Sequence, residues 1–277
     1  MVSQDRAEIL MTTGTMPLPA KSDPDAEKAG TEEAEDASGT PHLVIRFYRK
    51  EDRAAVRKIC ADTGFLGSPI DPLFEDRELF ADYLTQYYTD REPQSTLVCE
   101  VDGRIMGYLM GSRLHRAYRF YRIWNNAWLF LKGIYRYFSR PYNIASRQYV
   151  RWLLSRAAAE SPFTPQGLPH FHINILAQAR SVRTARGIID QFLEYLKANG
   201  EKGVYAQVIA FEGRRSIRTF ERYGFRVVDQ AEVTKYRHLR EGQIFLFTII
   251  KDLTANTRLY GNDLHQVETT DSSVAAQ

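Results

Sequence analysis

Two hydrophobic periods alternate along the middle of the chain, and their order predicts its secondary structure. Apolar residues at every second position predict strands over residues 43–47, 96–101, 104–110 and 169–176. Stripes at every third and fourth position predict helices over residues 51–64, 76–88 and 184–198. The dipeptide Asp102-Gly103, between the second and third strands, is a strong signal for a two-residue hairpin.

The same patterning continues to residue 253. It predicts a strand over residues 204–210, a short helix over residues 214–223 that ends at Gly224, and two closing strands over residues 232–238 and 243–250. We therefore expect one mixed α/β domain over residues 41–253, with residues 113–168 inserted between its third and fourth strands.

The two ends of the chain lack this patterning. Residues 1–40 carry nine acidic against three basic residues, which predicts a disordered acidic segment. The polar composition of residues 254–277 predicts a loose tail. No apolar run reaches the ~20 residues that span a bilayer, and the N-terminus lacks the layout of a signal peptide. Cys60 and Cys99 lie in apolar runs, which is typical of reduced core thiols, so we expect a cytoplasmic protein.

A strand, an arginine-rich loop, a helix, a second strand and a second helix follow one another between His170 and Phe225. The loop reads Arg180-Ser181-Val182-Arg183-Thr184-Ala185, and the second helix closes at Gly224-Phe225. This order is similar to the cofactor-binding half of the GNAT superfamily of acetyl-CoA-dependent N-acetyltransferases. That family has Arg/Gln-x-x-Gly-x-Gly/Ala in the loop and Ala-x-x-x-Tyr-x-x-x-Gly-Phe in the helix. The run His170-Phe171-His172-Ile173 also resembles the acetyltransferase-like domain associated with O-GlcNAcase.

The resemblance covers most of residues 41–253 and implies a mixed central sheet flanked by helices, with acetyl-CoA or a longer acyl-CoA as donor. It implies that the pantetheine arm binds the backbone at the end of the fourth strand, at Ile175, Leu176 and Ala177. It places the pyrophosphate at the start of the next helix, where free amides and the helix dipole attract anions. The residues implied there are Arg180, Ser181, Val182, Arg183, Thr184, Ala185 and Arg186, with Phe220 against the cofactor arm.

Two positions depart from the GNAT pattern. Arg183 stands where the family has glycine, and Phe220 stands where many members have a tyrosine that protonates the leaving thiolate. Arg183 can place a guanidinium on the phosphates, or the loop can have lost the cofactor. Two hypotheses follow. One is an acyl-CoA-dependent N-acyltransferase that acts on a small-molecule amine by direct attack, and the other is an inactive relative that binds a ligand or a partner.

Acyl transfer to an amine uses a base for the amine proton and an acid for the departing thiolate. The period of two places His170 and His172 on one face of the fourth strand, and an unperturbed imidazole titrates near pH ~6.5. Either histidine is a candidate base, and either can equally be a hydrogen-bonded interior residue. Tyr236, on a predicted strand beside the acceptor, is the first candidate acid, ahead of Tyr205 and Tyr223. The histidines and cysteines are too scattered to predict a metal site.

The net charge of +3 hides a strong segregation, because residues 113–168 carry nine arginines and one lysine against one acid, Glu160. The arginines alternate with aromatic residues, and a helix is expected over residues 144–158. Three roles stay open for this insertion: a helical lid over the acceptor groove, a clamp for an anionic acceptor or the CoA phosphates, and a contact with a membrane surface or an acyl chain. No nucleic-acid-binding motif is present, so we expect no nucleic acid partner.

Overall fold

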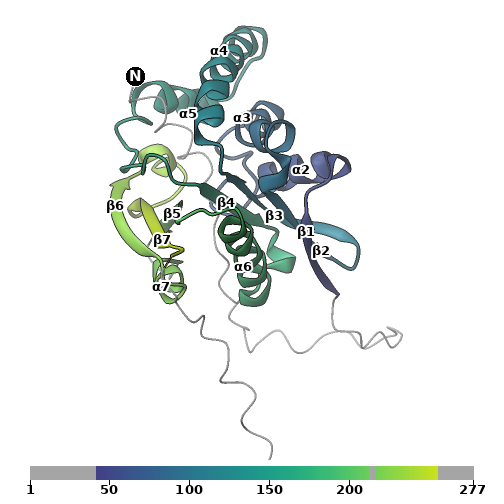
Figure 1. Ribbon diagram of the computed structural model, residues 1–277. Helices are drawn as coiled ribbons and strands as arrows, with labels where there is room; N and C mark the ends of the chain where they lie inside the picture. The colour runs from purple at the N-terminus through teal and green to yellow at the C-terminus, as the bar shows by residue number, and fades with distance from the viewer. Residues whose placement is uncertain (1–41, 212–215, 255–277) are drawn as a thin grey trace, which may run out of the picture.

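Seven strands form one mixed sheet in the computed structural model, which describes residues 42–211 and 216–254 (Figure 1). They lie in the order β1-β2-β3-β4-β5-β7-β6. The strands are β1 (Leu43–Phe47), β2 (Thr96–Val101), β3 (Arg104–Ser112), β4 (His170–Ile175), β5 (Gly203–Phe211), β6 (Arg226–Glu232) and β7 (Ile244–Asp252). The predicted hairpin at Asp102-Gly103 is confirmed, since both residues adopt the positive φ that such a turn requires.

Helices cover both faces of this sheet (Figure 1). They are α2 (Arg53–Thr63), α3 (Arg77–Asp90), α4 (His115–Ser139), α5 (Ile144–Ser155), α6 (Val182–Ala198) and α7 (Ser216–Arg222). α2 and α3 pack on one face through a core that includes Val56 and Leu84. α6 and α7 pack on the other face through a second core that includes Ile188 and Phe220. The apolar stripes predicted for α2 and α6 are the faces that these helices bury.

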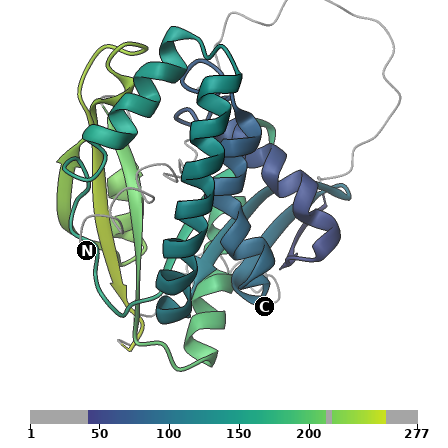
Figure 2. The same cartoon turned by 90° about the horizontal axis from the view of Figure 1, so that it is seen from above.

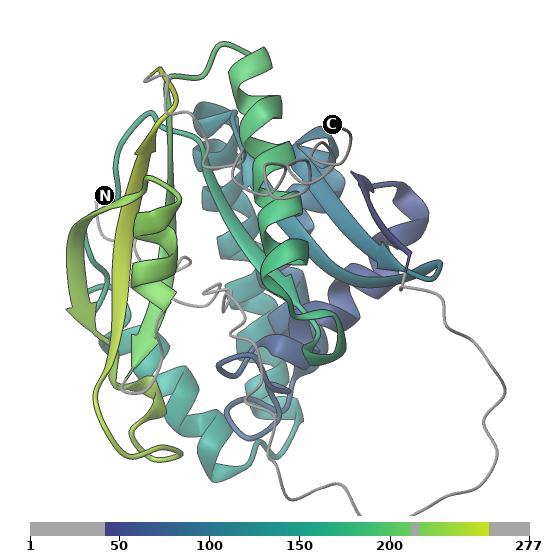
Figure 3. The ribbon, with the colours of Figure 1, turned by 90° about the horizontal axis from the view of Figure 1, so that it is seen from below.

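The sheet divides between β4 and β5. β4 pairs with β3 over six residues, and β5 pairs with β7 over nine, both antiparallel. The parallel pairing of β4 with β5 is limited to His170 with Tyr205 and Phe171 with Ala206. Beyond these pairs the two strands diverge, with α6 beside the β1–β4 half and α7 beside the β5–β7 half (Figure 3). The predicted fold, a mixed sheet flanked by helices, is confirmed.

The two faces of β4 meet different environments, as the period of two predicted. Phe171, Ile173 and Ile175 pack in the core beneath α6. His170 and His172 face the opposite side, where each contacts the ring of Tyr88 from α3. A strand buried on both faces therefore separates two hydrophobic cores, and its two histidines both face the core on the side of α3.

α4 and α5 form the insertion between β3 and β4. α4 lies against α3, and in the view from above it is in front, toward the viewer (Figure 2). α5 packs near the turn at residues 234–236, where Lys235 lies over the ring of Trp152. Among the helices that the structure describes, none is both long and apolar enough to cross a membrane.

The strand predicted over residues 232–238 is wrong. The strand at this point is β6, which ends at Glu232, and Thr234–Tyr236 is a turn of 3-10 helix. The amide of Val233 still donates to the carbonyl of Ile244 at 2.8 Å, so pairing with β7 ends directly before this turn. The carboxylate of Glu160 holds the turn, because it accepts bonds from the backbone N and the Oγ1 of Thr234, at 2.7 and 2.6 Å.

Several further predictions fall at the edges of the structure. The disordered segment predicted over residues 1–40, the polar tail from residue 255 onward and the first two residues of the helix predicted over 214–223 lie outside the described residues.

The two cysteines are confirmed as core residues, since Cys60 and Cys99 are both buried and free. Burial raises the pKa of each thiol to about 12, so both are protonated at neutral pH.

A fully buried carboxylate joins the end of α3 to the start of the insertion. The side chain of Glu92 accepts bonds from the hydroxyls of Tyr87, Ser95 and Ser112, at 2.7, 2.8 and 2.8 Å. It also accepts from the backbone amide of Arg113 at 2.6 Å, directly before α4. A buried charge is tolerated only when donors surround it, and here those donors come from α3, the following turn, β3 and the segment that enters α4.

We predict that Glu92→Gln lowers the free energy of unfolding by about 2–4 kcal/mol, because the amide group would direct hydrogens at donors that need an acceptor. Chemical denaturation followed by circular dichroism measures this loss. Glu241→Gln, at an exposed position, is the matched control. Equal stability of the two variants would show that the cluster around Glu92 contributes little.

Candidate functional site

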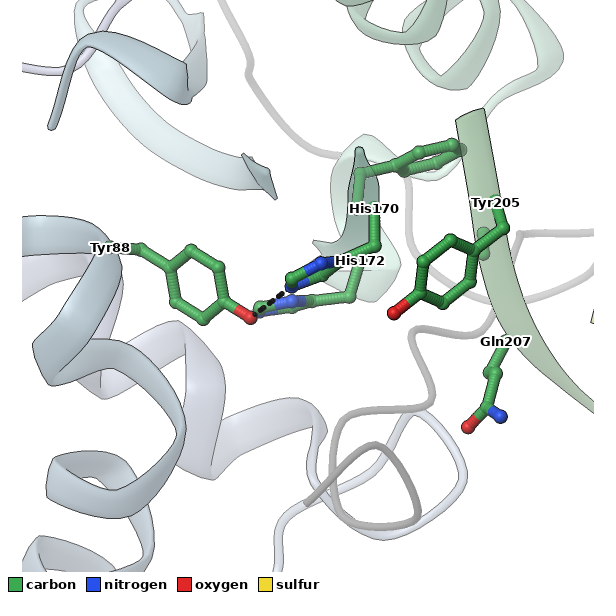
Figure 4. Close-up of a pocket in the computed structure, with 7 residues that line it drawn as sticks. Tyr88, His170, His172, Tyr205 and Gln207 are labelled. Carbon is green, nitrogen blue, oxygen red and sulfur yellow. Dashed lines mark hydrogen bonds between the residues drawn. The ribbon is translucent and has the colours of Figure 1, made fainter. Parts of the chain in front are cut away.

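A small cavity lies where β4 and β5 begin to diverge (Figure 4). Its polar side chains come from three elements: Tyr88 from α3, His170 and His172 from β4, and Tyr205 and Gln207 from β5. The hydroxyls of Tyr88 and Tyr205 point toward the histidines, and Gln207 lies on the same side of β5 as Tyr205, because residues two apart on a strand share a face (Figure 4). The site therefore combines the predicted histidines and Tyr205, a candidate acid, with Tyr88 and Gln207, which the sequence did not single out.

His170 is held on several sides by aromatic rings. Its Nε2 lies 2.8 Å from the hydroxyl of Tyr88, and its ring centroid lies 4.7 Å from that of Tyr118, on α4, and 5.5 Å from that of Tyr205. Burial, together with the neighbouring His172, lowers the pKa of His170 to about 3. The imidazole is therefore neutral at physiological pH and fixed in orientation.

His172 differs from His170 in its hydrogen bonding. Its ring contacts those of Tyr88 and Tyr108, with centroids 5.1 and 5.8 Å away, and burial lowers its pKa to about 3. Its Nε2 is buried and has no hydrogen-bond partner among the described residues. Gln207 has the same feature: its Nε2 donates to Thr248 at 3.1 Å, while its buried Oε1 has no partner there. Two unsatisfied polar atoms in one water-sized cavity indicate a place for one small polar group, such as a water molecule.

The backbone of β4 offers a second set of polar groups. The amide of Leu176 donates to the carbonyl of Met106 at 2.8 Å, so this residue bonds toward β3. Alternate residues of an antiparallel strand bond to the same side, so Ile173 and Ile175 direct their amides and carbonyls toward β5. Since β5 has diverged by then, these groups line the opening of the sheet.

The start of α6 lies at the end of the same opening. Ser181 caps the helix, and its Oγ accepts from the amide of Thr184 at 3.0 Å. The first two helical residues are Val182 and Arg183, whose amides have no partner within the helix. Arg183 is exposed and has a helical conformation, so its side chain causes no backbone strain and does not enter the core. In this conformation the position does not require glycine.

Solved structures resemble this architecture, although no protein-family model matches the sequence and no curated protein matches it significantly. The structure of SsHAT aligns with a TM-score of 0.52 and 23% identity, over 77% of this chain and 99% of its own. yncA from Salmonella typhimurium, solved with its cofactor acetyl-CoA, aligns with a TM-score of 0.45 and 14% identity, over 76% of this chain and 94% of its own. A GCN5-related N-acetyltransferase from Kribbella flavida aligns with a TM-score of 0.44 and 13% identity, over 76% of this chain and 97% of its own. The chain has the GNAT fold.

Arg180 occupies the first position of the GNAT loop motif, but its guanidinium turns inward. Its Nε donates to the carbonyl of Ile175 at 2.8 Å, and its other nitrogen donates to the carbonyl of Gly67, in the loop between α2 and α3. Desolvation lowers the pKa of this group, although an arginine stays charged. Arg180 thus joins the end of β4 to the α2–α3 loop, and these bonds direct it away from solvent.

The remaining predicted cofactor residues divide into exposed and buried groups. Ala177 is exposed directly after β4, while Ala185 is fully buried under the first turn of α6. The Nε of Arg186 lies 3.4 Å from the carboxylate of Asp190. Phe220, at the position of the GNAT tyrosine, is buried and packs edge to face on Phe225 with centroids 5.6 Å apart. Phe220 is therefore a core residue of the α7 side.

Tyr236, the predicted acid, does not lie on a strand beside the cavity. It belongs to the 3-10 turn, is buried, and contacts Phe65 with ring centroids 5.7 Å apart. The lining tyrosines are Tyr88 and Tyr205. Tyr205, predicted from the sequence as a candidate acid behind Tyr236, is thus one of the lining residues. The described residues include no group of three or more His, Cys, Asp or Glu that could hold a metal ion.

The buried neutral histidines make the protein sensitive to acid. In the unfolded chain they titrate near pH ~6.5, whereas burial lowers the native pKa of each to about 3. The unfolded chain therefore binds more protons below pH ~6.5, and the free energy of unfolding falls as pH decreases toward about 3. We predict that, between pH 7 and pH 4, the free energy of unfolding of His172→Phe falls by on the order of 2 kcal/mol less than that of wild type. Denaturation at each pH measures this difference.

The exposed His115→Phe is the control for this measurement and should leave the pH dependence unchanged. If His172→Phe and wild type lose stability in parallel on acidification, His172 is not buried in its neutral form.

Proposed function

We propose that this protein is an acyl-CoA-dependent N-acyltransferase that transfers an acetyl group to a small-molecule amine. The observation that carries the proposal is the divergence of β4 from β5 directly beside the first turn of α6. This arrangement supports acyl-CoA binding because one opening offers both an unpaired strand edge and an anion-attracting helix terminus. The resemblance of the Arg180–Ala185 segment to the GNAT loop supports the same donor.

The residues present fit an acyl-CoA in two places. The backbone groups of Ile173 and the amide of Ile175 would hold the amide-bearing pantetheine arm, because they lack a strand partner, while the carbonyl of Ile175 accepts from Arg180. The amides of Val182 and Arg183 would hold the pyrophosphate, and the exposed guanidinium of Arg183 would add a charged donor. When bound, the thioester supplies an activated acyl carbon. Arg180 would contribute indirectly, by fixing the strand end from which the arm departs.

The nitrogen of the acceptor amine would bind at the cavity, which has room for about one water-sized group. His172 Nε2 and Gln207 Oε1 are buried groups that can accept hydrogen bonds from an amine. As the new C–N bond forms and the thioester C–S bond breaks, the amine proton requires an acceptor, and the leaving thiolate needs no obligatory acid near neutral pH. A neutral imidazole with a pKa of about 3 is a weak base, so His172 suits the binding of an already neutral amine and a proton relay.

A second candidate, a ligand-binding protein without turnover, is favoured by a different observation. Phe220 lacks a hydroxyl and fills the core, and Tyr236 is displaced from the cavity. The two positions considered first for the acid therefore do not supply it, and the phenols at the cavity are those of Tyr88 and Tyr205. Loss of this acid costs rate without abolishing binding, so the two candidates differ in turnover and not in affinity.

We predict that acetyl-CoA binds the full-length protein with a micromolar dissociation constant in calorimetry. A panel of polyamines, arylamines and amino sugars, assayed by release of free thiol, should contain an acceptor that accelerates release above the rate of hydrolysis. Absence of heat at high micromolar acetyl-CoA would refute acyl-CoA binding altogether. Binding without acceptor-dependent release would support the ligand-binding candidate.

We predict that Val182→Pro weakens acetyl-CoA binding by about tenfold or more, because it removes one amide from the proposed pyrophosphate site. Proline is tolerated at the first residue of a helix, and Ser181 already has the extended backbone that precedes proline readily. The melting temperature should stay close to that of wild type. Val182→Ala, which keeps the amide, is the control and should retain full affinity. Equal affinities for both variants would place the phosphates elsewhere.

A further inference from the structure

α4 is an amphipathic helix in which the charged side faces the protein. Its Lys132 donates to Asp82 of α3 at 2.7 Å, and its Arg136 donates at 2.6 Å to Asp76, the residue that caps α3. The hydroxyl of Tyr142, just beyond α4, also donates to Asp76 at 2.7 Å. These bonds attach α4 to α3 through its inner side, which also buries Tyr118 and Leu129.

The opposite side of α4 is apolar, aromatic and exposed. The largest exposures are those of Phe138, Tyr135, Trp124 and Trp128, at 82, 73, 68 and 65%. A helical repeat of 3.6 residues places them along one side, opposite the buried Tyr118 and Leu129. The other exposed apolar residues of this side, which we call the outer face of α4, are Phe120, Ile123, Phe130, Leu131 and Ile134.

The size of the outer face exceeds what folded monomers ordinarily expose. Large aromatic side chains present 150–250 Å² each, so this face exposes on the order of 1,000 Å², whereas the largest apolar patch of a typical monomer is about 300–600 Å². An area of this size needs a partner that covers it in water.

Charge decides which partner fits. Neither α4 nor α5 contains an aspartate or glutamate. Exposed arginines accompany the outer face, because Arg116 and Arg119 lie in the first turns of α4. A second copy docked symmetrically would bring the same basic helix against itself, which is unfavourable. An anionic lipid surface offers both components, because acyl chains accept the rings and headgroups accept the arginines.

We propose that the outer face of α4 binds the surface of a membrane that contains anionic lipids, with the helix axis in the plane of the interface. The inner side of α4 remains attached to α3, so only the outer half of the helix can enter lipid. The interaction goes beyond the proposed acyltransferase activity and needs no turnover.

Tryptophan provides the first test. The chain has three tryptophans, of which Trp124 and Trp128 are exposed on the outer face and Trp152 is buried. With full-length protein, vesicles of phosphatidylcholine and phosphatidylserine should shift the tryptophan emission to the blue and carry the protein upward in a flotation gradient. Vesicles of phosphatidylcholine alone should carry much less. Trp124→Phe with Trp128→Phe should still float but should lose the spectral shift.

Two variants separate the apolar and the charged contributions. Trp128→Ser with Phe138→Ser should lower the fraction that floats severalfold, while Phe163→Ser, an exposed phenylalanine outside α4 and α5, should leave it unchanged. Arg116→Glu with Arg119→Glu should weaken binding to anionic vesicles on the order of tenfold or more. Acidic residues suit the first turns of a helix, so this variant should fold normally.

Three results would overturn the proposal. The first is failure of the full-length protein to float with any vesicle, and the second is equal binding to neutral and anionic vesicles. The third is strong protection of the tryptophans from acrylamide before lipid is added. Such protection would mean that a second copy or another segment of this chain already covers the outer face, and light scattering would identify a dimer.

Discussion

The divergence of β4 from β5 is the constraint on which the rest of this protein depends. Two parallel pairs join these strands, whereas β4 pairs along its length with β3 and β5 pairs along its length with β7. The backbone of β4 is therefore hydrogen-bonded along the side of β3, and that of β5 along the side of β7. The two edges that lack a continuous strand partner face each other. Groups that fill the opening, from Arg180 to the cavity side chains, are placed by this geometry.

Buried polar groups then determine how the elements around the opening are joined. Glu92 joins the end of α3 to the start of α4, and Asp76 joins the start of α3 to the end of α4. The two carboxylates thus bracket a pair of neighbouring helices. Between them, Tyr88 and Tyr118 contact the same histidine on β4, so the inner side of the insertion packs against a residue that lines the cavity. The insertion consequently supports the site through His170.

Most of the fold could be predicted because burial imposes a period on the sequence. α6 has a continuous apolar stripe and a serine cap, and β4 alternates between two packed faces, so both were predicted closely. β6 is an edge strand of mixed polarity with an irregularity between Val227 and Asp229, and it has no comparable period. The strand predicted over residues 232–238 is wrong because residues 234–236 form a turn, which Glu160, distant in sequence, holds through the amide and the hydroxyl of Thr234. Such tertiary hydrogen bonds leave no local signal.

The candidate site shows the same limit. The sequence identified His170 and His172 by alternation, but their low pKa depends on enclosure by Tyr88, Tyr108 and Tyr118, which come from three other elements. The guanidinium of Arg180 could be predicted near the loop, yet its two carbonyl partners are set by the end of β4 and by the α2–α3 loop. Arg183 therefore becomes the exposed guanidinium at the first turn of α6. Because that residue has a helical φ, replacing glycine there adds a charge without distorting the backbone, so this departure from the GNAT motif alters the chemistry of the loop and leaves its shape intact.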